Sequence, residues 1–132
     1  MTTYDFGSGP VPAHRHINPD KSLGGWVANT TYIADNAQVY GDARVYGNAR
    51  VYGDAEVSGN AQVTYTPICI SGLYWPVTIT DNHMRIGCEM HLKTEWNNFD
   101  DARIKLMDSR ALEFWNQYKG ILLFLCDKSK QR

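Results

Sequence analysis

The sequence predicts a mainly β protein built on a short left-handed parallel β-helix of about two turns. A β-branched residue recurs every six positions, at Val27, Ile33, Val39, Val45, Val51, Val57 and Val63. A small residue follows four positions after each of the first six, at Thr31, Ala37, Ala43, Ala49, Ala55 and Ala61. A period of six does not fit an amphipathic helix, whose apolar stripe recurs every 3.6 residues, and is typical of repeat architectures.

Each six-residue unit is predicted to form one short strand and one corner. Between residues 41 and 60, Gly-Asp or Gly-Asn pairs supply the residues that most easily adopt tight-turn conformations. If three units close one triangular turn, residues 18 apart stack on each other. We therefore expect Val27 below Val45 and Val63, Ile33 below Val51, and Val39 below Val57.

The flanks of the repeats predict extra strands and a C-terminal helical appendage within a single domain, residues 1–132. We divide it into an N-terminal cap (1–26), the hexapeptide β-helix (27–64), further strands (65–92) and helices (93–132). Alternating apolar residues between Ile68 and Ile79 predict two or three strands, with another from Met84 to Cys88. Asp100-Asp101 opens a helix to Met107, and Asp108-Ser109 precedes one that ends near Cys126. Apolar residues on one face of the second helix, at spacings of three and four, predict a packing surface: Ala111, Trp115, Tyr118, Leu122 and Leu125.

Composition argues against several classes of partner. The 132 residues carry 13 Lys and Arg against 14 Asp and Glu, a formal charge of −1, so no bulk attraction to nucleic acid or to a membrane is expected. The longest apolar run, residues 120–126, is too short to span a bilayer. The N-terminus lacks a secretion signal, and three cysteines are an odd number, so a cytoplasmic protein with reduced thiols is expected.

The repeat resembles the hexapeptide-repeat left-handed β-helix proteins over residues 27 to about 64. The flanks, residues 10–18 with 24–27 and residues 77–83 with 86–88, resemble a group of uncharacterised bacteriophage and prophage proteins that are often labelled hexapeptide transferases. The resemblance implies a homo-oligomer, with a trimer favoured, that has clefts between parallel coils. It also implies the cytoplasm of a bacterial host. Similarity of fold is weak evidence for function.

Candidate ligand contacts come from the basic and aromatic residues. His14, Arg15 and His16 form a polar cluster that either contacts an anion or another ligand, or is a solvated loop or a hydrogen-bonded cap on the first turn. Repeated tyrosines and arginines on flat β faces suit an interface or a cleft, where they could stack on a base and neutralise a phosphate. The full set of predicted ligand-binding residues is His14, Arg15, His16, Trp26, Tyr40, Arg44, Tyr46, Arg50, His83 and Arg85.

Metal and catalytic interpretations have less support. Cys69, His83, Cys88 and His91 are potential zinc ligands, but their spacing matches no standard finger, and buried thiols with a turn histidine explain them equally well. We predict no metal and no cofactor. His83 or His91 could serve as the base of a hexapeptide-type acyltransferase, although the repeats carry no extruded loop, and no other catalytic motif is present.

The sequence therefore favours binding over catalysis. The leading hypothesis is a non-enzymatic phage-type oligomer that counteracts host defence by sequestering a nucleotide-like signal in clefts between subunits. A direct protein inhibitor of a host defence complex is the first alternative. A hexapeptide-type acyltransferase is the second.

Overall fold

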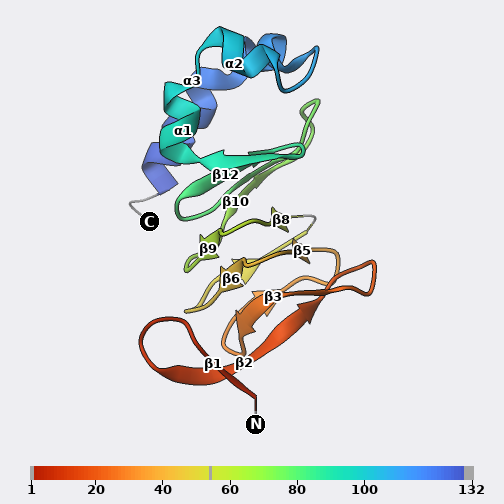
Figure 1. Ribbon diagram of the computed structural model, residues 1–132, viewed down its shortest axis with the longest axis vertical. Helices are drawn as coiled ribbons and strands as arrows, with labels where there is room; N and C mark the ends of the chain where they lie inside the picture. Colours follow the sequence, from red (N-terminus) through yellow and green to blue (C-terminus); the bar gives the residue numbers. More distant parts are fainter. Residues whose placement is uncertain (1, 54, 130–132) are drawn as a thin grey trace.

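The computed structural model describes residues 2–53 and 55–129. The molecule is elongated, with N-terminal strands at one end, the repeats in the middle and helices at the other end (Figure 1). The first strands are β1 (Thr3–Asp5), β2 (Pro10–Ile17) and β3 (Leu23–Ala28). The repeats form β4 (Tyr32–Ile33), β5 (Gln38–Val39), β6 (Arg44–Val45), β7 (Arg50–Val51), β8 (Glu56–Val57) and β9 (Gln62–Val63). Then follow β10 (Ile68–Ile70), β11 (Val77–Ile79), β12 (His83–Ile86), β13 (Glu89–Leu92), α1 (Lys93–Asn98), α2 (Asp101–Lys105) and α3 (Ala111–Ser129).

The described strands pair into four small sheets. A five-stranded sheet has the order β1-β2-β3-β6-β9, in which β1–β2 and β2–β3 are antiparallel and the remaining pairs are parallel. The strands β10 to β13 form a fully antiparallel sheet. Two separate pairs, β4–β7 and β5–β8, are parallel.

The predicted fold class, a mainly β left-handed parallel β-helix, is wrong. The described residues instead form a mixed structure, with several small sheets, extensive antiparallel pairing and three helices. The strands β4 to β9 are only two residues long and most of each hexapeptide lies in turns, so the parallel ladders are also two residues long. Longer antiparallel ladders and a helical layer in the flanks make up the rest of the fold.

The 18-residue register predicted for the inward residues is confirmed. Val27 pairs with Val45 and Val45 with Val63, while Ile33 pairs with Val51 and Val39 with Val57. All of these valines are fully buried. At the corners, Gly41, Gly47, Gly53 and Gly59 have φ between +57° and +71°, a region that glycine adopts without steric cost. One predicted corner residue, Asp54, lies outside the described residues.

The hairpin of β2 and β3 packs against the first repeats, at β5 and the segment between β5 and β6. Gly24 and Gly25 lie directly against backbone carbonyls, where an added Cβ would come within 1.9 Å of the oxygens of Val39 and Ala43 respectively. The buried side chain of Asn18 donates to the Val39 carbonyl at 3.1 Å and accepts from the Val39 N–H at 2.8 Å. The hairpin thus satisfies the backbone N–H and carbonyl of Val39, which would otherwise lack these partners.

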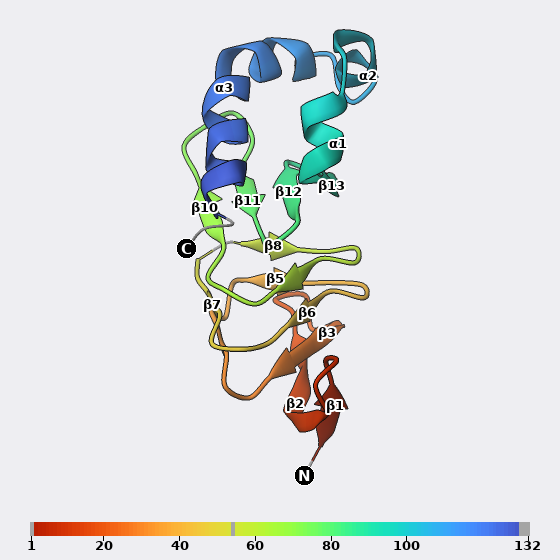
Figure 2. The ribbon, with the colours of Figure 1, turned by 90° about the vertical axis from the view of Figure 1, so that its left-hand side faces the viewer.

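The four-stranded sheet packs against the other end of the repeats. The Asp81 carboxylate accepts hydrogen bonds from the N–H and hydroxyl of Thr64. Arg85 makes an ion pair with Glu56 at 2.6 Å and donates to the Ser58 hydroxyl at 2.8 Å. Figure 2 shows β11, β12 and β13 above β8 and below the helices. The N-terminal end of the repeats therefore continues into strands of its own five-stranded sheet, whereas the other end meets a separate antiparallel sheet.

A second apolar core lies between the four-stranded sheet and the helices. It contains Ile79 and Met84 from the sheet together with Trp96, Trp115 and Leu122 from the helices. The packing predicted for the stripe on α3 is confirmed, since Ala111, Trp115 and Leu122 are buried and Tyr118 and Leu125 pack partly against this core. Among the described residues, no helix has the length and apolar character needed to cross a bilayer.

The two helices predicted from their caps are confirmed with small shifts. Asp100 accepts from the Arg103 N–H at the start of α2, and Asp108 accepts from the Arg110 N–H just before α3. The strand predicted from Met84 to Cys88 instead ends at Ile86, because Gly87 turns the chain with φ +57°. Cys69, Cys88 and Cys126 are free thiols, the first two exposed and the third buried.

Candidate functional site

A row of outward-facing side chains crosses the five-stranded sheet. Arg15 on β2 pairs with Trp26 on β3, Trp26 with Arg44 on β6, and Arg44 with Gln62 on β9. The residues that follow Trp26, Arg44 and Gln62 along the chain are fully buried valines. Because successive strand residues point to opposite faces, this row lies on the outer face of the sheet.

Aromatic rings from β1 and its following loop lie over this row. The ring of Tyr4 stacks on Trp26, with centroids 4.9 Å apart and 17° between planes, and contacts the edge of Phe6 at 4.8 Å. Phe6 stacks on Tyr46 at 4.8 Å and 21°. The Tyr46 hydroxyl donates to the Gln62 side-chain carbonyl at 3.2 Å, so a chain of contacts runs from Trp26 to Gln62, the two register partners of Arg44. We call these seven residues the arginine–aromatic face: Tyr4, Phe6, Arg15, Trp26, Arg44, Tyr46 and Gln62.

The charge of this face is positive. Arg44 is half-buried as a residue, and its guanidinium makes no hydrogen bond or ion pair with any residue that the structure describes. Arg15 donates its Nε–H to the Gly24 carbonyl at 2.6 Å, which leaves its terminal N–H groups available as donors to a ligand. None of the seven residues carries a carboxylate. A partly desolvated guanidinium without a counter-ion favours an anionic ligand, because pairing offsets the loss of hydration.

A hollow of about 400 Å³ adjoins the face beside Phe6 and Tyr46. Its walls include Val11, Asn29 and Asn48. The Asn29 side-chain oxygen bonds His14 at 2.7 Å, so its amide N–H groups remain available as donors. The hollow therefore combines apolar ring surface with amide groups, and such a combination can hold and orient a flat heterocycle.

The structure brings four of the ten predicted ligand residues onto this face: Arg15, Trp26, Arg44 and Tyr46. His14 lies at the rim of the hollow through its bond to Asn29. His16 is buried, and its Nε2 lies 2.9 Å from the Ala37 carbonyl, which is the capping role considered as the alternative. Tyr40 follows β5 and Arg50 starts β7, both outside the five-stranded sheet.

The last two predicted residues, His83 and Arg85, lie on β12, which belongs to the four-stranded sheet and not to the five-stranded one. Arg85 is already paired with Glu56. His83 lines a polar hollow with Asn60, Gln62 and Lys93, and its Nδ1 is buried without a hydrogen-bond partner among the described residues.

Burial lowers the pKa of His83 below its ordinary value of 6.5; the Glu95 carboxylate opposes this, while Lys93 and His91 add to it. The unfolded chain then binds a proton at a higher pH than the folded chain does. The contribution of neutral His83 to stability is therefore complete above about pH 6.5 and is lost as the pH falls below that value.

We expect the difference in unfolding free energy between the wild type and His83→Gln to shrink from pH 7.5 to pH 5. Urea denaturation at several pH values measures it. Asn116→Ala, at an exposed position that does not titrate, is the control, and its difference in unfolding free energy should not change with pH. A constant difference for His83→Gln would contradict the expected pKa shift.

Sequence reasoning missed Tyr4, Phe6 and Gln62. The signal for the first two was present, because Tyr4 and Phe6 are aromatic residues two apart and so share one face of an extended strand. Gln62 occupies the place in its unit that Arg44 and Arg50 occupy in theirs. That position gave no indication of its contact with Tyr46.

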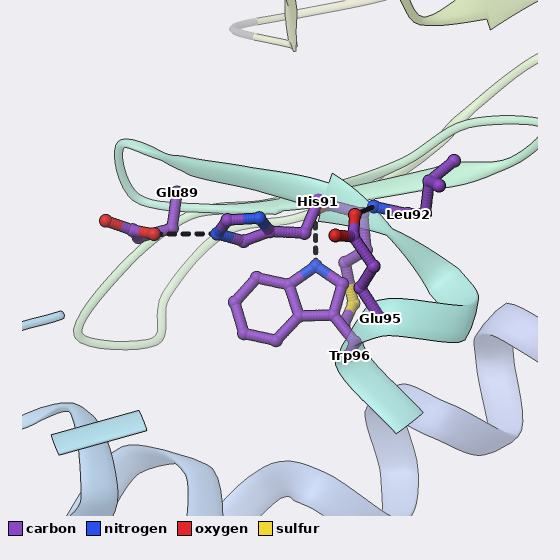
Figure 3. Close-up of polar contacts among 6 residues, drawn as sticks. Glu89, His91, Leu92, Glu95 and Trp96 are labelled. Atoms are coloured by element: carbon purple, nitrogen blue, oxygen red, sulfur yellow. Dashed lines mark hydrogen bonds and ion pairs between the residues drawn. The ribbon is translucent and has the colours of Figure 1, made fainter. Parts of the chain in front are cut away.

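The possible zinc ligands do not assemble. Among the residues described, no three His, Cys, Asp or Glu side chains gather as a metal site requires. His91 Nε2 instead lies 2.7 Å from Glu89 Oε1 on the edge strand β13 (Figure 3).

Comparisons with models of protein families, with curated proteins and with solved structures found no match to this chain.

Proposed function

We propose that the protein binds a nucleotide-like ligand on the arginine–aromatic face and holds it without turnover. The observation that carries this proposal is the half-buried Arg44, which lies between Trp26 and Gln62 and whose guanidinium has no partner among the described residues. A phosphate is the anion whose geometry a guanidinium matches best. Arg15, two strands away in the same row, supplies a second positive charge.

The heterocycle of such a ligand fits the adjoining hollow. Phe6 and Tyr46 offer apolar contact there, and the amides of Asn29 and Asn48 offer hydrogen bonds. Trp26 and Tyr46 already stack on Tyr4 and Phe6. The base therefore enters at the hollow rather than between these stacked pairs. This places the ligand on one subunit, in contrast to the sequence hypothesis of a cleft between subunits.

Release of the ligand unchanged is part of the proposal, since the face holds a phosphate contact and ring surfaces but no paired acid and base. Capture without turnover is consistent with a protein that removes a signalling nucleotide. A role against a bacterial host defence, and assembly as a trimer, stay predictions from the resemblance.

Native mass spectrometry with linear and cyclic adenine and guanine nucleotides tests the proposal. The chain offers a matched pair of variants, Arg44→Gln and Arg50→Gln, which have the same mass. Arg50 is the equivalent residue of the next unit, is exposed, and lies in register with Tyr32 on another sheet. We expect Arg44→Gln to weaken binding about 10- to 100-fold, as for a lost hydrogen bond to a charged group, and Arg50→Gln to leave it unchanged.

Three results would count against the proposal. One is the absence of any nucleotide adduct on the wild type. Another is equal weakening by Arg44→Gln and Arg50→Gln, which would indicate a non-specific charge effect. The third is a nucleotide recovered in altered form after denaturation, which would replace binding with catalysis.

A further inference from the structure

A second cavity lies at the opposite end of the molecule, between the four-stranded sheet and the helices. Two aromatic pairs form its walls. Trp75 and Phe114 are 5.2 Å apart at 63°, and Trp96 and Trp115 are 5.2 Å apart at 37°. Ile86 and Ile104 complete the apolar lining. Three of the four tryptophans of the chain thus surround one small space.

These rings are held by contacts that leave the cavity open. The Trp96 indole N–H donates to the Met84 carbonyl at 2.7 Å, which fixes the ring against β12. Trp75 packs on Gly87, where an added Cβ would come within 2.9 Å of the indole. The aromatic walls are therefore positioned before any ligand enters, which reduces the entropic cost of binding.

Acidic residues reach the lining of this aromatic cavity. Glu89 and Asp108 both line it, and none of the lining residues among those described is a lysine or an arginine. Glu89 Oε1 lies 2.7 Å from His91, whereas Oε2 has no partner among the described residues. Two nearby cations, Arg103 and Arg110, lie over the rings of Phe99 and Tyr74 respectively. Electron-rich ring faces with carboxylates beside them attract a cation that carries apolar groups.

The volume sets the size of that cation. The cavity measures about 70 Å³, roughly half of the ~150 Å³ space that accommodates benzene in an engineered apolar cavity. A group of three or four non-hydrogen atoms fits. A nucleobase does not fit. From these observations we propose that the cavity binds the N-methylated ammonium group of a small amine, with its methyl groups against the indoles and its N–H directed to Glu89 or Asp108.

Two isosteric probes separate charge recognition from simple apolar binding. Protonated 2-(dimethylamino)ethanol and neutral 3-methyl-1-butanol have the same arrangement of non-hydrogen atoms and differ in the central nitrogen. Titration of the full-length protein, followed through its ¹⁵N indole NMR signals, is expected to shift Trp75, Trp96 and Trp115. Trp26, on the arginine–aromatic face, is the internal control and should not shift. The amine is expected to bind about tenfold more tightly than the alcohol.

Charge variants complete the test. Glu89→Gln, or Asp108→Asn if the first variant does not fold, should lower the affinity for the amine to that of the alcohol while leaving the alcohol unchanged. Glu113→Gln, an exposed position on α3 outside the cavity, should change neither. Equal affinity for the two probes, or no shift of the three indole signals with either probe, would overturn the proposal. Neither outcome bears on nucleotide binding at Arg44.

Discussion

Replacing Gly25 by alanine is expected to destabilise the protein by about 3 kcal/mol or more. Gly25 lies on β3 where the hairpin crosses the first turn of the repeats. An added Cβ would lie 1.9 Å from the Ala43 carbonyl oxygen and 2.9 Å from its carbon. Because both atoms belong to the backbone, no side-chain rotation relieves the overlap, and the hairpin must move away from the repeats. That movement would also weaken the nearby hydrogen bonds of Asn18.

Urea denaturation of Gly25→Ala measures this effect, with Gly120→Ala as the matched control. Gly120 is exposed within α3, and an added Cβ meets no atom within 4 Å. The control should gain about 0.5–1 kcal/mol, because alanine favours the helix and restricts the unfolded chain. A loss of less than 1 kcal/mol for Gly25→Ala would show that the hairpin and the repeats are less tightly packed than described.

Asn18→Ala is expected to cost about 3 kcal/mol. The side chain bonds both the N–H and the carbonyl of Val39 in a buried environment, and the Asn18 side chain is 1% exposed. Its removal leaves a buried donor and a buried acceptor without partners, and each costs roughly 1–3 kcal/mol. Water that enters the space left by the side chain would recover part of the loss.

The comparison for Asn18 is Asn29→Ala, measured in the same denaturation assay. Asn29 is exposed and bonds only the exposed His14 through its side-chain oxygen, so its replacement should cost less than about 1 kcal/mol. Similar losses of unfolding free energy for the two variants would contradict the view that Asn18 stabilises the repeats by bonding the backbone of Val39.

The sequence by itself determined the local features of the repeats. The inward valines and alanines, their 18-residue register and the glycine corners follow from side-chain alternation and from backbone freedom at glycine, and both act within a few residues. The helices α2 and α3 were also predictable, because Asp100 and Asp108 mark their starts. Helix α1 was missed. Its N-cap is Leu92, which has no side-chain oxygen, and only Glu95 bonds back to the Leu92 N–H.

Only the tertiary structure decided the fold class and the site. The local pattern does not reveal that each ladder is two residues long, or that antiparallel flanks and helices complete the molecule. Arg44 and Arg50 occupy the same place in nearly identical hexapeptides, yet only Arg44 lies between Gln62 and Trp26, the ring on which Tyr4 of β1 stacks. The environment of a side chain depends on which distant segment packs over it, because that packing sets its desolvation and its partners. For these two arginines the distant segment is the N-terminal strand.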